Sequence, residues 1–141
     1  MADDAFWDLY IDAIIEIVFD GRTQCVRGPN AEALPGDPPI FVMTAYNPGG
    51  EDRDDATNEP SERALEHELS SEDVTFWPAY GRSRDASWSE PGVAVVDFDR
   101  TRACAYGRRY GQLAIYELTA EQVHVVRCDD AEVVRTAGRR K

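Results

Sequence analysis

The chain of 141 residues and 15.8 kDa has a length that suits one domain with a single core. Its 43% hydrophobic residues and three tryptophans exclude a disordered chain, and no apolar run approaches the roughly 20 residues that a membrane-spanning helix needs. The formal net charge of −12 argues against duplex or single-stranded nucleic acid and against a membrane surface as partners, because both bind clustered Lys and Arg.

The N-terminal segment changes from helical to strand-like patterning. Apolar residues at helical spacing predict a short helix over 3–12, and the β-branched residues that follow predict a strand over 14–19. Asp20-Gly21 is typical of a hairpin turn, and residues 23–26 form the returning strand. The alternative is one continuous helix through Val18.

A loop, a strand and a turn are predicted next. Residues 27–39 are rich in proline and glycine, which indicates a loop. The apolar run 39–45 predicts a buried, central strand that the turn 47–50 closes.

The following segment predicts an amphipathic helix over 60–70. Pro60 suits the first helical position, so Asn58 or Glu59 is the expected cap. The polar residues of this helix, Glu62 among them, are expected to face water or the rim of the helix's buried face.

The C-terminal half alternates strands with one helix and ends in a basic tail. We expect strands over 74–80, 92–98, 112–118 and 123–127, a loop over 81–87, and a helix over 99–110 capped by Asp97 or Asp99. The tail, 135–141, is expected to be a solvated, frayed end.

These elements predict an α+β fold, because strands follow one another without an intervening helix. We expect one domain over residues 1–141, a sandwich in which two or three helices pack on a mixed or antiparallel sheet of about five to seven strands.

The charged residues and cysteines bear on where the protein works. Acids outnumber bases by 27 to 15, and the only lysine is Lys141, a composition typical of proteins from a salt-adapted cytoplasm; the alternative is a genome bias that favours arginine codons. Three widely spaced cysteines without a CxxC motif predict reduced thiols and no zinc site. Acids at the N-terminus argue against a signal peptide, so we expect a cytoplasmic protein.

Four motifs occur in order along the middle of the chain: Thr44-Ala45-Tyr46-Asn47-Pro48, Asn58 before a helix, Trp88-Ser89-Glu90-Pro91-Gly92, and Arg109-Tyr110-Gly111-Gln112-Leu113-Ala114-Ile115. Over residues 40–117 this pattern resembles the domain of unknown function 3293 family. The resemblance implies a small bacterial or archaeal cytoplasmic domain and implies no particular activity. The acidic loop after Pro48 and the Glu59-Pro60 pair after Asn58 depart from the family pattern.

The motif residues are also the candidate binding residues. Thr44 and Asn47 follow the predicted central strand, where a sheet often presents ligand-binding groups. Glu90 beside Trp88 has the environment of a general acid, and Gln112 is suited to reading an amide or a base. A structural role in turns and caps is the alternative for each of them, and it already accounts for their positions.

Two further features of the sequence are candidate sites. Arg109 is suited to holding a phosphate or carboxylate, although it also suits the C-terminal end of the predicted helix. The acids Asp52, Asp54 and Asp55 lack the ordered spacing of a calcium loop and are expected to be solvated.

Two functions from different classes follow. The first is a non-catalytic binding module, in which Thr44, Asn47, Asn58, Trp88, Glu90, Arg109 and Gln112 recognise a small polar ligand or a protein segment. The alternative is a small hydrolase or transferase on a nucleotide-like or amide substrate, with Glu90 as acid or base. We expect no cofactor and no metal.

Overall fold

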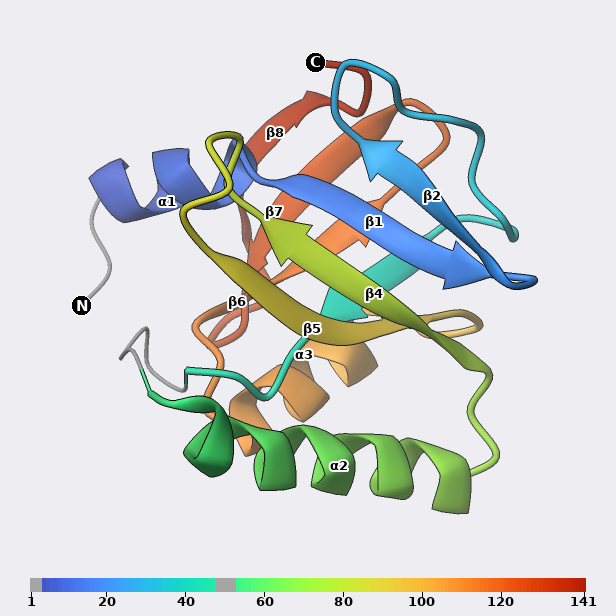
Figure 1. The fold of residues 1–141 in the computed structure, drawn as a ribbon, viewed down its shortest axis with the longest axis vertical. Helices are drawn as coiled ribbons and strands as arrows, with labels where there is room; N and C mark the ends of the chain where they lie inside the picture. Colours follow the sequence, from blue (N-terminus) through green and yellow to red (C-terminus); the bar gives the residue numbers. More distant parts are fainter. Residues whose placement is uncertain (1–3, 48–52) are drawn as a thin grey trace.

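The computed structural model describes residues 4–47 and 53–141, which contain three helices and eight strands (Figure 1). In chain order these are α1 (Asp4–Ile11), β1 (Ile14–Phe19), β2 (Arg22–Arg27), β3 (Ile40–Met43), α2 (Asp55–Ser71), β4 (Phe76–Arg82), β5 (Ser89–Val95), α3 (Arg100–Arg109), β6 (Ala114–Leu118), β7 (Gln122–Arg127) and β8 (Val133–Gly138). The strands form one antiparallel sheet in the order β2-β1-β4-β5-β3-β6-β7-β8. The α+β class with helices packed on an antiparallel sheet is confirmed, and the strand count differs, because the described residues form eight strands in one curled sheet rather than the expected five to seven.

The sheet buries apolar side chains on both of its faces. Its concave face encloses a core that includes Ile15 and Val42, and its convex face packs against α2 and α3 around Phe41 and Leu65. All four residues of β3 are buried and alternate between these two cores, as side chains along a strand must. The predicted central strand is therefore confirmed.

The N-terminal segment is a helix followed by a strand, as predicted. Trp7 on α1 is buried, while the β-branched run Ile14–Phe19 forms β1 and turns through Asp20-Gly21 into β2. Helix α1 lies at one end of the curled sheet (Figure 1), where Arg135 of β8 forms ion pairs with Asp4 and Asp8.

Helix α2 begins five residues earlier than the predicted helix 60–70, and neither Asn58 nor Glu59 is its cap. The cap is Asp54, whose side chain accepts a 2.9 Å hydrogen bond from the backbone N–H of Thr57. Pro60 is inside the helix, close enough to the N-terminus that the missing N–H removes only one of the first intrahelical bonds.

Strand β5 also begins earlier than predicted, so Glu90 and Pro91 lie within it rather than in the preceding loop. It runs close to β3 at Gly92, where an added Cβ would stand 2.4 Å from the Met43 carbonyl oxygen. Helix α3 is capped by Asp99, one of the two predicted caps. The Asp99 side chain accepts a hydrogen bond from the Arg102 N–H.

The C-terminal tail is not a frayed end. It forms β8, and the Arg139 side chain after it is 3% exposed. Its guanidinium donates to the carbonyl oxygens of Val26, Glu32, Thr119 and Ala120, and its own carbonyl accepts from Gly28 N–H at 2.7 Å. These bonds link the ends of the two edge strands, β2 and β8, of the curled sheet.

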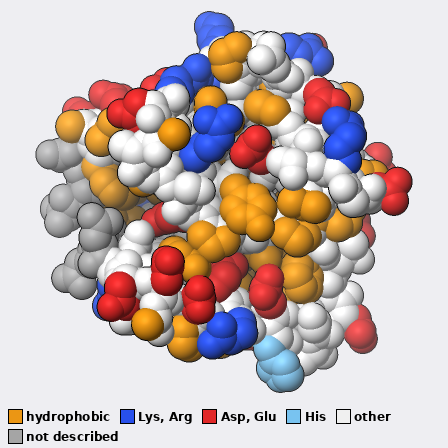
Figure 2. Space-filling model, viewed as in Figure 1, with side chains coloured by type: hydrophobic (Ala, Val, Ile, Leu, Met, Phe, Trp, Pro, Cys, Tyr) orange, Lys and Arg blue, Asp and Glu red, His pale blue; other side chains and the backbone are white. Residues whose placement is uncertain are grey.

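The surface in Figure 2 carries acidic side chains over α2 and hydrophobic side chains over β4. Pro78 and Tyr80 of β4 are exposed. None of the helices in the described part of the chain is long and apolar enough to span a membrane.

Candidate functional site

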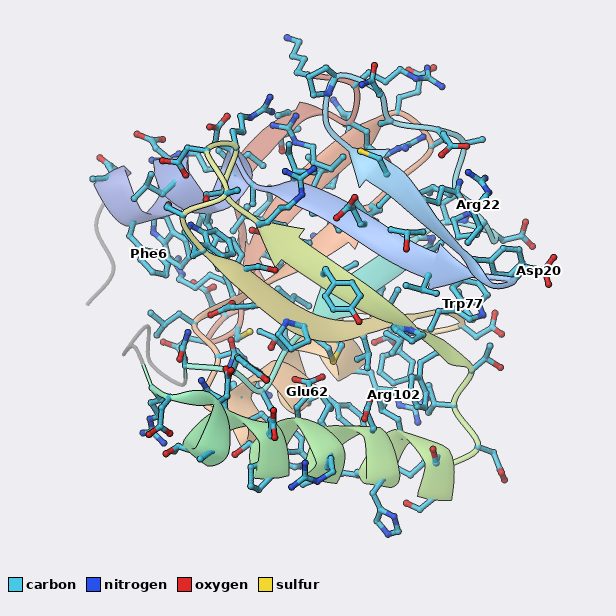
Figure 3. All side chains as sticks on the ribbon, viewed as in Figure 1. Phe6, Asp20, Arg22, Glu62, Trp77 and Arg102 are labelled. Carbon is cyan, nitrogen blue, oxygen red and sulfur yellow. The ribbon has the colours of Figure 1, made fainter. Side chains whose placement is uncertain are left out.

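An open cleft of about 620 Å³ lies between α1, the turn after β3, the start of β5 and the turn between α3 and β6. In Figure 1 this is the side of the molecule where α1 lies above the start of α2. Its apolar wall consists of Phe6, Leu9, Tyr10, Tyr46, Trp88 and Leu113. Figure 3 shows the Phe6 ring projecting from α1 on the side that faces α2. The polar side chains of the cleft come from segments far apart in the sequence.

Asn47 and Asn58 form the most closely bonded part of the cleft. Asn58 is 2% exposed; its amide donates to Asn47 Oδ1 at 2.8 Å and to the Arg53 carbonyl oxygen at 3.0 Å, and its Oδ1 accepts from the Asn47 N–H at 2.9 Å. Asn47 has a left-handed backbone with φ of 48°, a conformation that asparagine tolerates better than most residues. The pair fixes the turn after β3 onto the first turns of α2.

Glu90 joins this pair from β5. The Asn47 side-chain amide donates to Glu90 Oε1 at 2.6 Å. The Asn47 oxygen, on the other side of the amide, accepts from the Arg53 N–H at 2.8 Å. The Asn47 side-chain amide thus orients the Glu90 carboxylate towards the cleft. Its nitrogen and its oxygen both take part in hydrogen bonds.

Gln112 and Trp88 complete the predicted residues that line the cleft. Gln112 Nε2 donates to the Tyr46 carbonyl oxygen at 2.9 Å, which ties the turn before β6 to the turn after β3. Trp88 precedes β5 and is 40% exposed. Asn47, Asn58, Trp88, Glu90 and Gln112 therefore line one concave surface.

A smaller cavity of about 30 Å³ adjoins the inner end of the cleft and shares Tyr10, Trp88 and Glu90 with it. Thr44 and Tyr116 also line this cavity. The Tyr10 and Tyr116 rings stack at 4.6 Å, and burial raises the pKa of both phenols, so both stay protonated.

Thr44 connects the cavity to a buried carboxyl group behind it. Its hydroxyl donates to the Pro91 carbonyl oxygen at 2.7 Å and lies 3.2 Å from Oε1 of Glu62. The same Glu62 oxygen accepts from the Ala45 N–H at 2.8 Å. Figure 3 shows Glu62 pointing from α2 towards the sheet.

The expectation that Glu62 faces water is wrong. Its side chain is 7% exposed, and Oε2 is buried without a hydrogen-bond partner. Burial raises the pKa of Glu62 to about 7, and the hydrogen bond from the Ala45 N–H opposes this rise by a smaller amount. The spacing of Asn58, Glu62, Leu65 and Leu69 places all four on one helical face, and this was the available sequence signal.

Arg109 lies away from the residues that line the cleft. Its guanidinium pairs with Glu68 of α2 and stands 5.1 Å from the centre of the Tyr106 ring. Arg109 lies in the last turn of α3, as the structural alternative predicted.

The acidic segment before α2 is only partly described. Asp54 caps the helix and Asp55 lines the cleft, whereas Asp52 lies outside the described residues. Across residues 4–47 and 53–141, no group of three or more His, Cys, Asp or Glu side chains is placed to hold a metal ion.

Comparison with known proteins gives one match. The model of a family described as "Protein of unknown function (DUF3293)" matches residues 43–115, which is more than half of the 141-residue chain. No curated protein and no solved structure matches the chain. The matched span includes Thr44, Asn47, Asn58, Glu90 and Gln112.

Proposed function

The chain belongs to the DUF3293 family, whose description names no activity. From the geometry of the cleft, we propose that the cleft is a non-catalytic binding site for a small polar ligand. The observation that carries the proposal is the Asn47–Glu90 hydrogen bond of 2.6 Å, which joins residues from separate segments at the floor of an aromatic-walled cleft. Groups held in place before binding lower the ordering cost of recognition.

The size of the cleft favours a small molecule over a protein segment. Its volume of about 620 Å³ falls within the range of small-molecule pockets, roughly 300 to 1,000 Å³. Apolar walls with a few convergent polar groups are the usual composition of such sites.

The chemistry of the lining favours binding over catalysis. A hydrolase or transferase that uses Glu90 needs a nucleophile or a second acid–base group beside it. The described titratable side chains that line the cleft with Glu90 are Tyr10, Tyr46, Arg53 and Asp55. Burial raises the pKa of Tyr10 and of Tyr46, so both phenols stay protonated. Arg53 lies in the turn before α2, and Asp55 is the first residue of that helix.

A thermal-shift screen with a matched pair of variants tests the proposal. Trp88 and Tyr80 are equally exposed aromatic side chains, at 40% and 39%, but only Trp88 lines the cleft. A panel of small neutral, cationic and anionic compounds is screened against wild type, Trp88→Ala and Tyr80→Ala. We expect at least one compound to raise the Tm of wild type and Tyr80→Ala but not of Trp88→Ala, and to be recovered unchanged.

Two results contradict the proposal. If no compound stabilises the protein, or if stabilisation is equal in both variants, the cleft is not the binding site. If a stabilising compound is converted to product and Glu90→Ala abolishes the conversion, the hydrolase or transferase alternative replaces binding.

A further inference from the structure

The hydroxyl groups at the inner end of the cleft have already donated their hydrogens within the protein. Thr44 donates to the Pro91 carbonyl oxygen at 2.7 Å, Tyr10 to that of Ala114 at 3.0 Å, and Tyr116 to that of Tyr10 at 2.6 Å. A hydroxyl carries one hydrogen, so these groups retain only lone pairs for a ligand.

Two of the three side-chain amides that line the cleft use both of their amide hydrogens within the protein. Gln112 Nε2 donates to the carbonyl oxygens of Tyr46 and Tyr110, and Asn58 Nδ2 donates to Asn47 Oδ1 and the Arg53 carbonyl oxygen. The Gln112 Oε1 atom, in contrast, receives no hydrogen bond from the described residues. Acceptors therefore predominate among these hydroxyl and amide groups, and the Glu90 carboxylate adds to them, while the donors of the lining are on Asn47, Arg53, Ser87 and Ser89.

The remaining features of the lining favour positive charge. Phe6, Tyr10, Tyr46 and Trp88 present aromatic rings, which attract cations through their faces. The charged residues of the lining are Arg53, Asp55 and Glu90, so the acids exceed the bases. The adjoining cavity of about 30 Å³ beside Glu90 is large enough for a group of one or two heavy atoms, since roughly 10 to 15 Å³ accommodates a water molecule.

We propose that the ligand is a small organic cation with a primary ammonium or guanidinium head, whose N–H groups donate to Glu90 and to Gln112 Oε1 while its apolar part lies against Trp88. This inference rests on the proposed binding function and specifies its ligand class. Phosphate-bearing ligands are disfavoured because they need donors, and the inner end of the cleft supplies acceptors.

Four benzyl compounds of matched size test the proposal by NMR on ¹⁵N-labelled protein at pH 7: benzylamine, benzyltrimethylammonium, benzyl alcohol and benzoate. Benzylamine is a cation with N–H donors, the trimethyl compound is a cation without them, and the other two are neutral and anionic. At millimolar concentrations, we expect benzylamine to shift the Trp88 indole signal, assigned with Trp88→Phe, and the amide signals of Asn47 and Gln112. Its Kd should be about tenfold lower than that of benzyl alcohol, with benzyltrimethylammonium between them.

Glu90→Gln keeps an oxygen that accepts from Asn47 but removes the charge. It should weaken benzylamine binding about tenfold and benzyl alcohol binding by a clearly smaller factor, because the neutral hydroxyl loses no charge–charge attraction. Glu121→Gln, an exposed position outside the cleft, removes the same charge and is the control for the overall field. The amide spectra of both variants should retain the wild-type dispersion, which shows that they are folded.

The outcomes separate this inference from the function on which it rests. If benzyl alcohol or benzoate binds in the cleft as tightly as benzylamine, or if Glu90→Gln has no more effect than Glu121→Gln, the cation assignment is overturned while the binding function stands. If none of the four probes shifts signals from the cleft, the cation assignment is overturned, and the binding function then stands or falls with the thermal-shift screen.

Discussion

The side-chain amide of Asn47 donates a 2.6 Å hydrogen bond to Oε1 of Glu90, which joins the turn after β3 to the second residue of β5. Asn58 holds Asn47 from the other side through two further hydrogen bonds. The polar floor of the cleft therefore depends on three segments that meet only in the folded chain, and substitutions in any of them should affect both stability and binding.

Asn47→Asp should destabilise the protein in a pH-dependent manner. Aspartate tolerates the left-handed backbone, but it places a second carboxylate against Glu90, so we expect the free energy of unfolding to fall by about 2–3 kcal/mol at pH 7.5 and by less at pH 4.5. Urea denaturation at both pH values measures the change. Asn30→Asp, at an exposed turn, is the control; an equal loss in both variants would contradict the role assigned to Asn47.

Glu62→Gln should remove a pH dependence of stability. The fold raises the pKa of this carboxyl from 4.5 to about 7, so its stabilising contribution is fully present below pH 4.5 and is lost as the pH rises through 7. The stability of Glu62→Gln relative to wild type should therefore increase by about 3 kcal/mol between pH 4.5 and pH 8.5. Urea melts across this range provide the measurement. Glu59→Gln, exposed on the same helix, should differ from wild type in free energy of unfolding by a nearly constant amount across this pH range. A similar pH dependence of this difference for both variants would contradict the prediction.

Arg139→Lys should destabilise the closure between β2 and β8. A lysine cannot reproduce a guanidinium that donates to four backbone carbonyl oxygens, so we expect a loss of about 2–4 kcal/mol in chemical denaturation. The neighbouring Arg140 is exposed and makes one bond, to the Ala31 carbonyl oxygen. Arg140→Lys should cost less than about 0.5 kcal/mol; a cost equal to that of Arg139→Lys would show that the buried bonds are not the cause.

Gly92→Ala should disrupt the approach of β5 to β3. The added Cβ would stand 2.4 Å from the Met43 carbonyl oxygen, whereas at Gly138 it would meet only the Lys141 side chain at 3.7 Å. We expect Gly92→Ala to lower the free energy of unfolding by about 3 kcal/mol or more and Gly138→Ala to change it by less than about 1 kcal/mol. Thermal denaturation of the two variants decides the matter, and equal Tm values would refute the packing argument.

Salt should stabilise the protein if its acidic surface is an adaptation to high ionic strength. With a net charge of −12, raising KCl from about 0.1 M to about 2 M screens the repulsion among carboxylates and should raise the Tm. Sorbitol at equal osmolality is the control, because it is excluded from the surface without screening charge. A Tm that is flat or falls with KCl would favour the genome-bias explanation of the arginine-rich composition.

The local elements of this protein follow from its sequence because short-range chemistry specifies them. The β-branched run Ile14–Phe19 forms a strand, Asp20-Gly21 turns it, and Asp99 caps α3, although β1 also pairs with the distant strand β4. The motif residues Asn47, Trp88, Glu90 and Gln112 were also identified from the sequence, and the structure brings them to one cleft. Their roles in binding remain a prediction.

Tertiary structure decided the features that depend on partners from distant segments. The sequence predicts that Glu62 and Arg139 are exposed charges. In the fold, Glu62 is buried and accepts from the Ala45 N–H, and Arg139 is buried and donates to backbone carbonyl oxygens of two hairpins. Arg109 and Gln112 belong to the same family motif, but Arg109 pairs with Glu68 and does not line the cleft. A sequence pattern reports what each segment prefers alone, whereas the burial of a charge depends on whether other segments supply its hydrogen bonds, and only the assembled fold decides that.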